Sequence, residues 1–184
     1  MKPSWLLALA APMVMAGSLH AAADYFLEID GIKGESSDSR HPESVEVFSF
    51  SWGASNDAAS GGGAGKVSFS DFSFTTKVSK ASPKLMLACA TGQHISHATL
   101  YLRRDENDPE DYIIIEMSDI LISSVQQRGQ TRDDLATSQS GTTSGDADDR
   151  PTEEVAFYYN RVAFTYIGPD GTSTTVEASR PAPQ

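Results

Sequence analysis

Apolar and polar side chains alternate along most of the chain after residue 23, and a period of two residues predicts β-strands rather than helices. In the first such segment, residues 25–30, three apolar side chains lie on one side, with Phe26 and two acidic residues on the other. Further strands are expected at residues 94–104, 112–117 and 120–126. The pattern therefore predicts a mainly-β fold.

In three longer segments the apolar set changes midway from one side of the strand to the other. A strand that exchanges its buried side needs an extra residue, seen as a bulge, or a bend that carries it to another face. Three such changes predict long strands that turn corners in a small barrel or an orthogonal sandwich. The changes fall between Val47 and Phe48, between Phe69 and Phe72, and between Tyr159 and Val162.

One segment, "SPKLMLACATG", has the signals of a helix instead. Ser82 suits the N-cap, Pro83 suits the first turn, and Gly92 suits the C-terminal stop. We expect the helix to pack an apolar flank against the sheet. That flank comprises Leu85, Met86, Ala88 and Cys89.

Three polar segments separate or follow these elements. Residues 31–43 form a turn-rich linker, and residues 128–154 are so rich in Gly, Ser, Thr, Asp and Gln that we expect a long mobile loop. The tail, residues 168–184, is also polar and is expected to be disordered. One domain over residues 24–167 is therefore predicted, long enough to enclose a hydrophobic core.

Residues 1–23 have the pattern of a secretory signal peptide, with one positive charge, an apolar run over residues 5–16 and a small-residue A-x-A site. The run is about half of the ~20 residues that cross a bilayer, so a retained anchor is not expected. We expect cleavage after Ala23, with Ala21 and Ala22 as alternatives. No later segment looks able to insert into a membrane. The sequence thus predicts an exported protein, periplasmic or extracellular after cleavage.

The chain carries 25 acidic and 14 basic side chains, for a formal net charge of −11. This sign argues against nucleic acid as a partner, because phosphates attract positive charge. Cys89 is the only cysteine, so no internal disulfide can form, although export would permit one. Within "LMLACA" we interpret it as a small apolar core residue rather than a nucleophile, since no base stands in motif context.

Gly65 and Lys66 end a glycine run that superficially matches a phosphate-binding loop. Such a loop requires G-x-x-x-x-G-K followed by Ser or Thr and a helix. Here Ser60 stands at the first glycine position, Val67 follows the lysine, and "VSFSDFSF" alternates as a strand. We therefore expect no nucleotide or other cofactor, and interpret the glycines as a flexible inter-strand loop that can reach a neighbouring molecule.

Other candidate chemistry is weak. His94 and His97 are three residues apart on an expected strand, so they point to opposite faces and do not chelate a metal together. The acidic stretch 105–111 lacks the spacing of a calcium loop, and we interpret it as a solvated hairpin turn with residues 107–109 at its tip. The chain has no serine-nucleophile motif. No catalytic or metal site is predicted, and a hydrolase is the least supported function.

Six segments, in order, resemble the Hcp family, the haemolysin-coregulated proteins that form the tube of the bacterial type VI secretion system. The combination of FSWG, glycine loop, aromatic strand and helix is specific to that family. The segments are "DYFLEIDGIKGESSD", "VEVFSFSWGAS", "GGGAGKVSFSDFSFTTKVSKASPKLMLACATGQHI", "ATLYLRR", "YIIIEMSDILISSV" and "TEEVAFYYNRVAFTY".

The resemblance implies a small β-barrel of two packed antiparallel sheets with one flanking α-helix, assembling into homohexameric rings. In the family, rings stack into a hollow tube whose lumen can carry effector proteins and whose tip bears a spike protein. The glycine segment resembles the family's extended loop, which supports contacts between subunits. We therefore expect a subunit contact that includes Trp52, Gly61, Gly62 and Gly63.

Two features depart from the family pattern. Tube proteins normally lack a cleavable signal peptide, and the family's C-terminal strand with Gly-Trp is missing, because a polar sequence follows Tyr166. The expected function is a secreted Hcp-like structural protein, either a type VI tube component or an exported relative of it. The alternative is a periplasmic or extracellular binding module for a protein or small ligand, outside the contractile machine.

Overall fold

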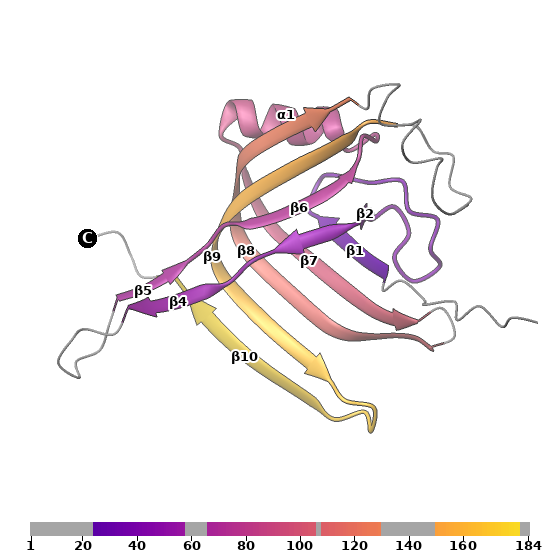
Figure 1. Ribbon diagram of the computed structural model, residues 1–184, viewed down its shortest axis with the longest axis vertical. Helices are drawn as coiled ribbons and strands as arrows, with labels where there is room; N and C mark the ends of the chain where they lie inside the picture. Colours follow the sequence, from indigo (N-terminus) through magenta and orange to yellow (C-terminus); the bar gives the residue numbers. More distant parts are fainter. Residues whose placement is uncertain (1–23, 58–65, 106–107, 130–149, 181–184) are drawn as a thin grey trace, which may run out of the picture.

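The computed structural model describes residues 24–57, 66–105, 108–129 and 150–180 (Figure 1). The expected signal peptide, the three glycines of the expected subunit contact, most of the expected mobile loop and the last four residues of the tail lie outside these ranges. The elements are β1 (Asp24–Ile29), β2 (Val45–Val47), β3 (Ser49–Ser51), β4 (Ala54–Asp57), β5 (Lys66–Phe69), β6 (Phe72–Lys77), α1 (Ser82–Thr91), β7 (His94–Asp105), β8 (Asp108–Arg128), β9 (Thr152–Ile167) and β10 (Ser173–Ser179).

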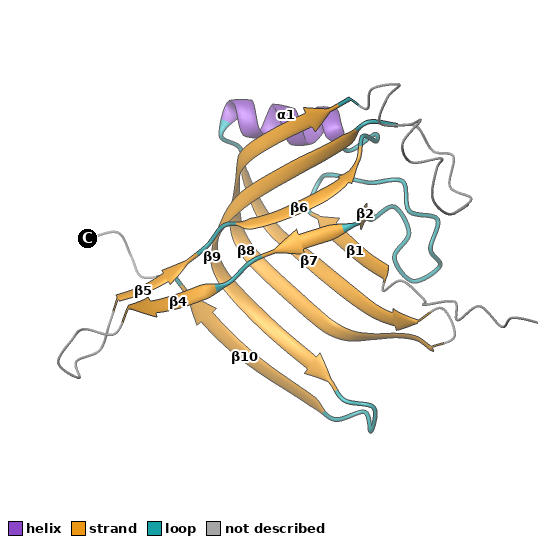
Figure 2. Cartoon of the chain, in the orientation of Figure 1, coloured by secondary structure: helices purple, strands orange, loops and turns teal. Residues whose placement is uncertain are grey.

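The strands form two antiparallel sheets. Eight of them make one curled sheet in the order β2-β1-β7-β8-β9-β6-β3, with β10 joined to β9, while β4 and β5 pair only with each other. Figure 2 shows the large sheet curling into an almost closed barrel, with the single helix at one end and β4–β5 leaving the barrel at the side. The predicted mainly-β barrel with one flanking helix is therefore confirmed.

The chain closes the barrel at the first predicted change of face. β2 pairs with β1, whereas β3 pairs with β6, so the segment between them crosses from one end of the sheet order to the other. The backbone N–H of Phe48 donates to the carbonyl of Thr75 at 2.8 Å, and the hydroxyl of Thr76 donates to the carbonyl of Glu46 at 2.6 Å. These bonds join β2 to β6 across the seam.

The change of face in β9 is a bend shared with its neighbours. Tyr159 and Val162 are both buried and lie opposite Ile120 and Met117 of β8 without a shift in register. Asp119, between the two buried β8 residues, has a φ of 56°, which turns that strand at the same level. The sheet therefore bends along one line across both strands, so the longer β8 replaces the two separate strands expected at residues 112–117 and 120–126.

The core fills the barrel with aliphatic side chains and one aromatic cluster. The rings of Phe72 and Phe157 stack at 4.9 Å, and Phe74 meets Phe157 edge-on at 6.3 Å. All three are at most 1% exposed, and burying each such side chain contributes about 1.5–3 kcal/mol. These residues are the apolar positions of the alternating pattern, which is why the strands could be found from the sequence.

Helix α1 begins one residue earlier than expected. Ala81 occupies the N-cap, and Ser82 is the first helical residue, so the predicted Ser82 cap is wrong. The Ser82 hydroxyl instead donates to the buried carboxylate of Glu153 at 2.7 Å and accepts the backbone N–H of Ser79 at 2.9 Å. The helix ends at Gly92, as expected, with a φ of 64°.

The buried flank of α1 is also narrower than expected. Leu85 and Ala88 face the core, and Cys89 is half-buried beside it. Met86 is 44% exposed, so its assignment to the packing flank is wrong. The buried face of the helix therefore consists of Ser82, Leu85 and Ala88, whose spacing of three brings them to one side.

The tail after residue 167 is ordered over most of its length, which corrects the expectation of disorder and of a missing strand. A tight turn, closed by the N–H of Gly168 donating to the carbonyl of Thr172 at 2.8 Å, reverses the chain. β10 then pairs with β9 from Ser173 opposite Ile167 to Ser179 opposite Arg161. All seven β10 residues are exposed, so backbone hydrogen bonds rather than apolar burial hold it.

Candidate functional site

The feature that leaves the barrel is a two-stranded ribbon made by β4 and β5, which we call the arm. Its strands pair in antiparallel register, with Ala54 opposite Phe69 and Asn56 opposite Val67. At its root the backbone N–H of Ser70 donates to the carbonyl of Gly53 at 2.9 Å. In Figure 1 the arm projects well beyond the barrel wall.

Of the predicted contact residues, the structure describes Trp52 but not the three glycines. Trp52 is half-buried at the root, where its ring packs on Phe164 of β9 at 5.9 Å. Phe69 meets the buried Tyr159 edge-on at 6.5 Å on the other arm strand. Trp52 thus helps to anchor the arm, and its remaining exposed surface is what a neighbour could contact. Gly61, Gly62 and Gly63 fall between β4 and β5 in sequence, outside the described residues, and their contact stays a prediction.

Arg180 ties the root of the arm to the end of β10. Its guanidinium donates to the carbonyl of Ser70 at 2.8 Å and to the carboxylate of Asp71 at 3.1 Å. The same group lies over the rings of Tyr158 and Tyr159, at 4.2 and 4.9 Å from their centroids. A cation over an aromatic face is attracted by the ring quadrupole. Arm, β9 and β10 are therefore held in one arrangement.

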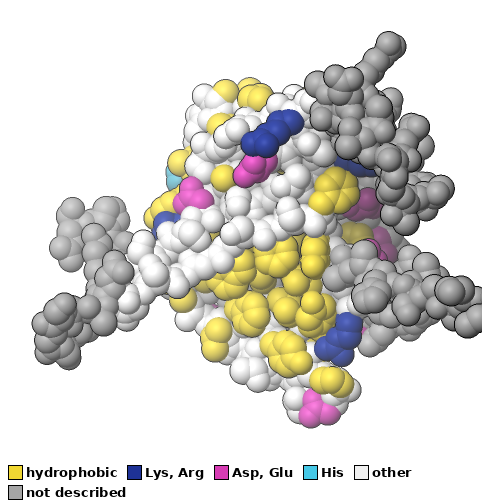
Figure 3. Space-filling view, in the orientation of Figure 1, with side chains coloured by type: hydrophobic (Ala, Val, Ile, Leu, Met, Phe, Trp, Pro, Cys, Tyr) yellow, Lys and Arg dark blue, Asp and Glu magenta, His cyan; other side chains and the backbone are white. Residues whose placement is uncertain are grey.

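The inner face of the sheet becomes exposed where it reaches β10. Phe164 and Val176 lie opposite each other on β9 and β10, and Tyr166 follows two residues along β9. Val176 is 60% exposed and Tyr166 is 42% exposed, unlike the fully buried Ile115 in the same row of β8. Figure 3 shows apolar side chains gathered on this side of the molecule, beneath the band of chain that leads to the arm. One wall of the barrel is thus open and apolar.

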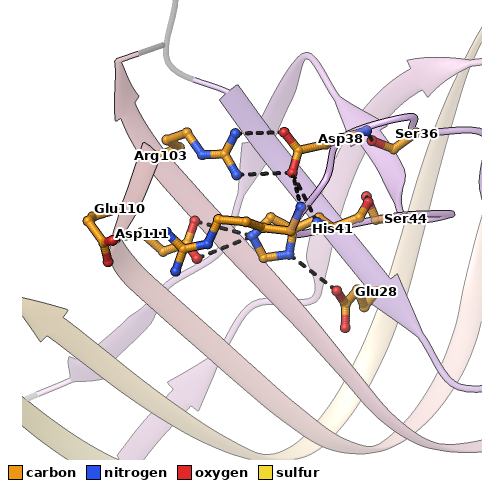
Figure 4. A network of polar contacts seen from close by, with 9 residues as sticks. Glu28, Ser36, Asp38, His41, Ser44, Arg103, Glu110 and Asp111 are labelled. Atoms are coloured by element: carbon orange, nitrogen blue, oxygen red, sulfur yellow. Dashed lines mark hydrogen bonds and ion pairs between the residues drawn. The ribbon is translucent and has the colours of Figure 1, made fainter. Parts of the chain in front are cut away.

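A second built feature is the loop over residues 31–43, which the sequence suggested was only a linker. The loop folds back on the outside of β1, β7 and β8 and inserts charged side chains against them (Figure 4). Asp38 accepts two bonds from the buried guanidinium of Arg103, at 2.7 and 3.1 Å. It also accepts the backbone N–H groups of Arg40 and His41, at 2.9 and 3.0 Å. The side-chain hydrogen bond from Arg103 holds the pKa of Asp38 well below its usual range, and Asp38 in turn raises the pKa of Arg103.

His41 lies at the centre of this loop contact. Its ring is stacked near Phe26 and Tyr101, at 5.0 and 4.3 Å between centroids. Its Nδ1 is 3.2 Å from Glu28 of β1, and its Nε2 is 3.2 Å from the buried Asp111 of β8. Burial, with Glu28 as the next cause, raises the pKa of Tyr101. The loop is therefore fastened to three strands.

Sequence reasoning missed this network because its partners are far apart in the chain. Asp38 and Arg103 are separated by 65 residues, and His41 and Asp111 by 70. The available local signal was an aspartate within a polar, turn-rich segment. In such turns the Asp side chain typically accepts hydrogen bonds from backbone N–H groups two or three residues later. That signal predicts the turn but not the strand it packs on. Asp111 is thereby placed in a buried contact, which corrects its assignment to a solvated turn.

The other candidates from the sequence do not come together in a site. His94 and His97 are exposed and lie apart, with Nδ1 of His94 at 3.1 Å from Asp119 and Nδ1 of His97 at 3.4 Å from Asp30. Lys66 begins strand β5, as the alternation predicted, and no helix follows it there. Within the described ranges, no group of three or more His, Cys, Asp or Glu side chains is arranged to hold a metal. In the same ranges no helix is long and apolar enough to cross a membrane.

A rigid barrel with a projecting ribbon, an open apolar wall and a clamped surface loop defines a structural, assembly-type β-barrel. The chain belongs to the Hcp family of the type VI secretion system, because the family described as "Type VI secretion system effector, Hcp" matches it over residues 26–166. This membership confirms the resemblance seen in the sequence and favours a type VI secretion function over a separate binding module.

Individual relatives agree with the family assignment. Protein hcp1 of Pseudomonas aeruginosa is 42% identical over 122 residues, which cover 63% of this chain and 75% of that protein. The crystal structure of Hcp1 from Salmonella typhimurium is 30% identical with a TM-score of 0.68, covering 86% of this chain and 95% of that one. A type VI secretion system effector from Yersinia pestis is 28% identical with a TM-score of 0.66, covering 85% and 99%. Hcp proteins are secreted structural tube proteins that form ring oligomers.

Proposed function

We propose that this chain is a tube component of a type VI secretion system that assembles into homohexameric rings through its arm. The observation that carries the proposal is the arm itself. A two-stranded ribbon is at best marginally stable alone in water, and within the described residues the ring contacts of this one with the barrel are at its root. A neighbouring subunit that covers it supplies the missing contacts. The glycines between β4 and β5, together with Trp52, are the contact we assign to it.

A closed ring needs two different patches on each subunit, since a head-to-tail contact is heterologous. Light scattering of residues 24–184 at micromolar concentration tests the ring, and a strictly monomeric protein across salt and concentration would refute it. Shortening residues 56–62, which include the last two residues of β4, should leave the barrel folded by circular dichroism, because β4 pairs only with β5 and the rest of the segment lies between strands. It should also reduce the hexamer in size-exclusion chromatography. An unchanged hexamer removes this loop from the interface.

The partners follow from the ring. The proposed lumen accepts effector proteins, and the end of a stack of rings accepts a spike protein. The role is structural, without catalysis. Co-purification with a spike protein and effectors of the same type VI system tests these partners, with the arm-shortened variant as control. Recovery of equal amounts by the variant would show that binding does not need the ring.

Export through the leader is a separate proposal. We infer that residues 1–23 are removed, so that the mature protein begins near Asp24. Asp24 is the first residue of β1 and pairs with Arg103 of β7, so β1 begins directly after the expected end of the leader. Intact mass of protein recovered from the periplasm or medium tests this. A full-length mass, in protein confined to the cytoplasm, would refute the cleavage.

A further inference from the structure

β10 has a free edge. Within the described residues it pairs with β9 alone, along seven residues, so its other edge presents unpaired N–H and C=O groups. Exposed edges in stable proteins are usually protected by lysine, proline, a bulge or a covering element. The sequence of β10, STTVEAS, has neither lysine nor proline, and its pairing with β9 has no bulge. The edge is open to addition of a further strand.

The same strand has one apolar side. Residues directly opposite each other in an antiparallel pair point to the same face, so Val176 shares the inner face with Phe164, and Thr174 shares it with Tyr166. The outer face of β10 is polar. A strand added to the free edge must therefore place apolar side chains beside Val176 to continue the open apolar wall.

The arm has the matching pattern. Asn56 and Val67 are opposite each other, as are Ala54 and Phe69, so these four residues share one face of the ribbon, while Ser55 and Ser68 are on the other. Val67 is 36% exposed on the apolar side. Within the described residues both outer edges of the ribbon lack a partner strand. The arm thus offers free edges and one apolar face, as β10 does.

We propose that the free edge of β10 in one subunit receives the arm of a second copy, with Val67 placed on the same side as Val176. The proposal rests on the ring-forming function and names the surface that the arm meets. Main-chain hydrogen bonds between added strands supply affinity, and alternate side chains supply register.

The Arg180 contact fixes the orientation of the arm relative to β10 within one subunit. Arg180 holds the end of β10 beside Ser70 and Asp71 at the root of the arm. In Figure 1 the arm projects away from the barrel, whereas β10 lies beside β9 in the barrel wall. Two different patches in a fixed relation are what a head-to-tail contact requires, since each subunit then gives one patch and receives the other.

Cysteine cross-linking between two differently tagged, co-expressed chains tests the contact. Both chains carry Cys89→Ala. One also carries Ser68→Cys on the polar face of the arm, and the other carries Ser173→Cys, Thr175→Cys or Ser179→Cys, which scan the polar face of β10. The expected result is a covalent dimer containing both tags, strongest at one position. If light scattering shows an oligomer but no position cross-links, the arm–β10 contact is refuted and the ring stands. A monomeric protein refutes both.

A matched pair of substitutions tests which face is buried. Val176→Lys puts a charge on the apolar face of β10, whereas Ser173→Lys puts the same charge on its polar face. Val176→Lys should raise the concentration for half-assembly by about tenfold or more, and Ser173→Lys by much less. Circular dichroism checks that both variants fold. Equal effects of the two substitutions would overturn the proposed placement of Val67 beside Val176.

Discussion

Replacing Asp38 by Asn removes the charge that fastens the loop over residues 31–43 to the barrel while keeping the shape of the side chain. Asp38 accepts both guanidinium bonds of Arg103, and its own carboxylate oxygen also caps two backbone N–H groups of the loop. Arg103 is 6% exposed, and its Nε has no hydrogen-bond partner. The substitution therefore removes the hydrogen-bonded counter-charge of a buried cation and leaves only the weaker influence of Asp111 and Asp24.

Removal of one partner from a buried ion pair typically costs about 3–5 kcal/mol in the free energy of unfolding. The side chain of Asp38 is 19% exposed, so water screens part of the charge, and we expect a loss of about 3 kcal/mol. Urea unfolding followed by circular dichroism measures it. All variants must be compared at one protein concentration, because assembly adds to apparent stability.

The same pair predicts a dependence on pH. Arg103 lowers the folded-state pKa of Asp38 below its unfolded value of about 3.9. The ionised carboxylate therefore stabilises the fold fully above the unfolded pKa, and this contribution disappears as the pH falls towards the folded pKa. The difference in stability between wild type and Asp38→Asn should be constant near neutral pH and shrink below about pH 4.

A double-mutant cycle with Arg103→Leu decides whether the contact itself is responsible. Residues in direct contact show coupling energies of about 0.5–3 kcal/mol, and we expect a value in the upper half of that range. A coupling near zero, or a stability difference that stays unchanged below pH 4, would refute the reasoning. It would mean that Asp38 acts only through the backbone of its turn.

Three further changes probe other contacts. Ser82→Ala removes the hydroxyl that donates to the buried Glu153, so urea unfolding should show a loss of about 1–3 kcal/mol, and no loss would show that water replaces the bond. Gly34→Ala adds a Cβ that would lie 2.1 Å from the carbonyl oxygen of Ser44, so we expect a lower melting temperature, with an unchanged value excluding the close approach. Trp52→Ala should lower the melting temperature and reduce assembly together, since the ring packs on Phe164, and a change in assembly alone would make Trp52 purely a subunit contact.

The barrel could be predicted because each strand has one face towards the apolar core and the other towards solvent. Phe72, Phe74 and Phe157 are core positions at every second residue, and alternation reports that arrangement directly. The bend near Tyr159 and Val162 could also be predicted, since a continuous strand must change its buried side there. The sequence did not show that β8 bends at the same level, because the two halves of β8 looked like separate strands.

β10 and the clamped loop escaped prediction for a different reason. β10 has no buried residue, and Val176 is its one large apolar side chain, so its sequence carries little apolar period; the strand is paired with the backbone edge of β9 and is followed by Arg180, which contacts the root of the arm. The loop over residues 31–43 depends on Arg103, which is distant in the chain and itself looks like a surface residue of a strand. Polar contacts of this kind leave no periodic pattern.

The arm shows how burial can fade along a single strand. Phe69 at the root packs against Tyr159, whereas Val67, two residues farther out on the same face, is 36% exposed. The apolar positions of β5 therefore alternate as in a strand, but only Phe69, at the root of the arm, packs against the core. Among the described residues, the outer half of the arm thus has an exposed apolar side chain, Val67, although a two-stranded ribbon is marginally stable in water without a covering layer. The exposed apolar side of the arm is explained by a surface that covers it. In the proposed contact that surface is β10 of a second copy, so the sequence of one chain encodes both surfaces.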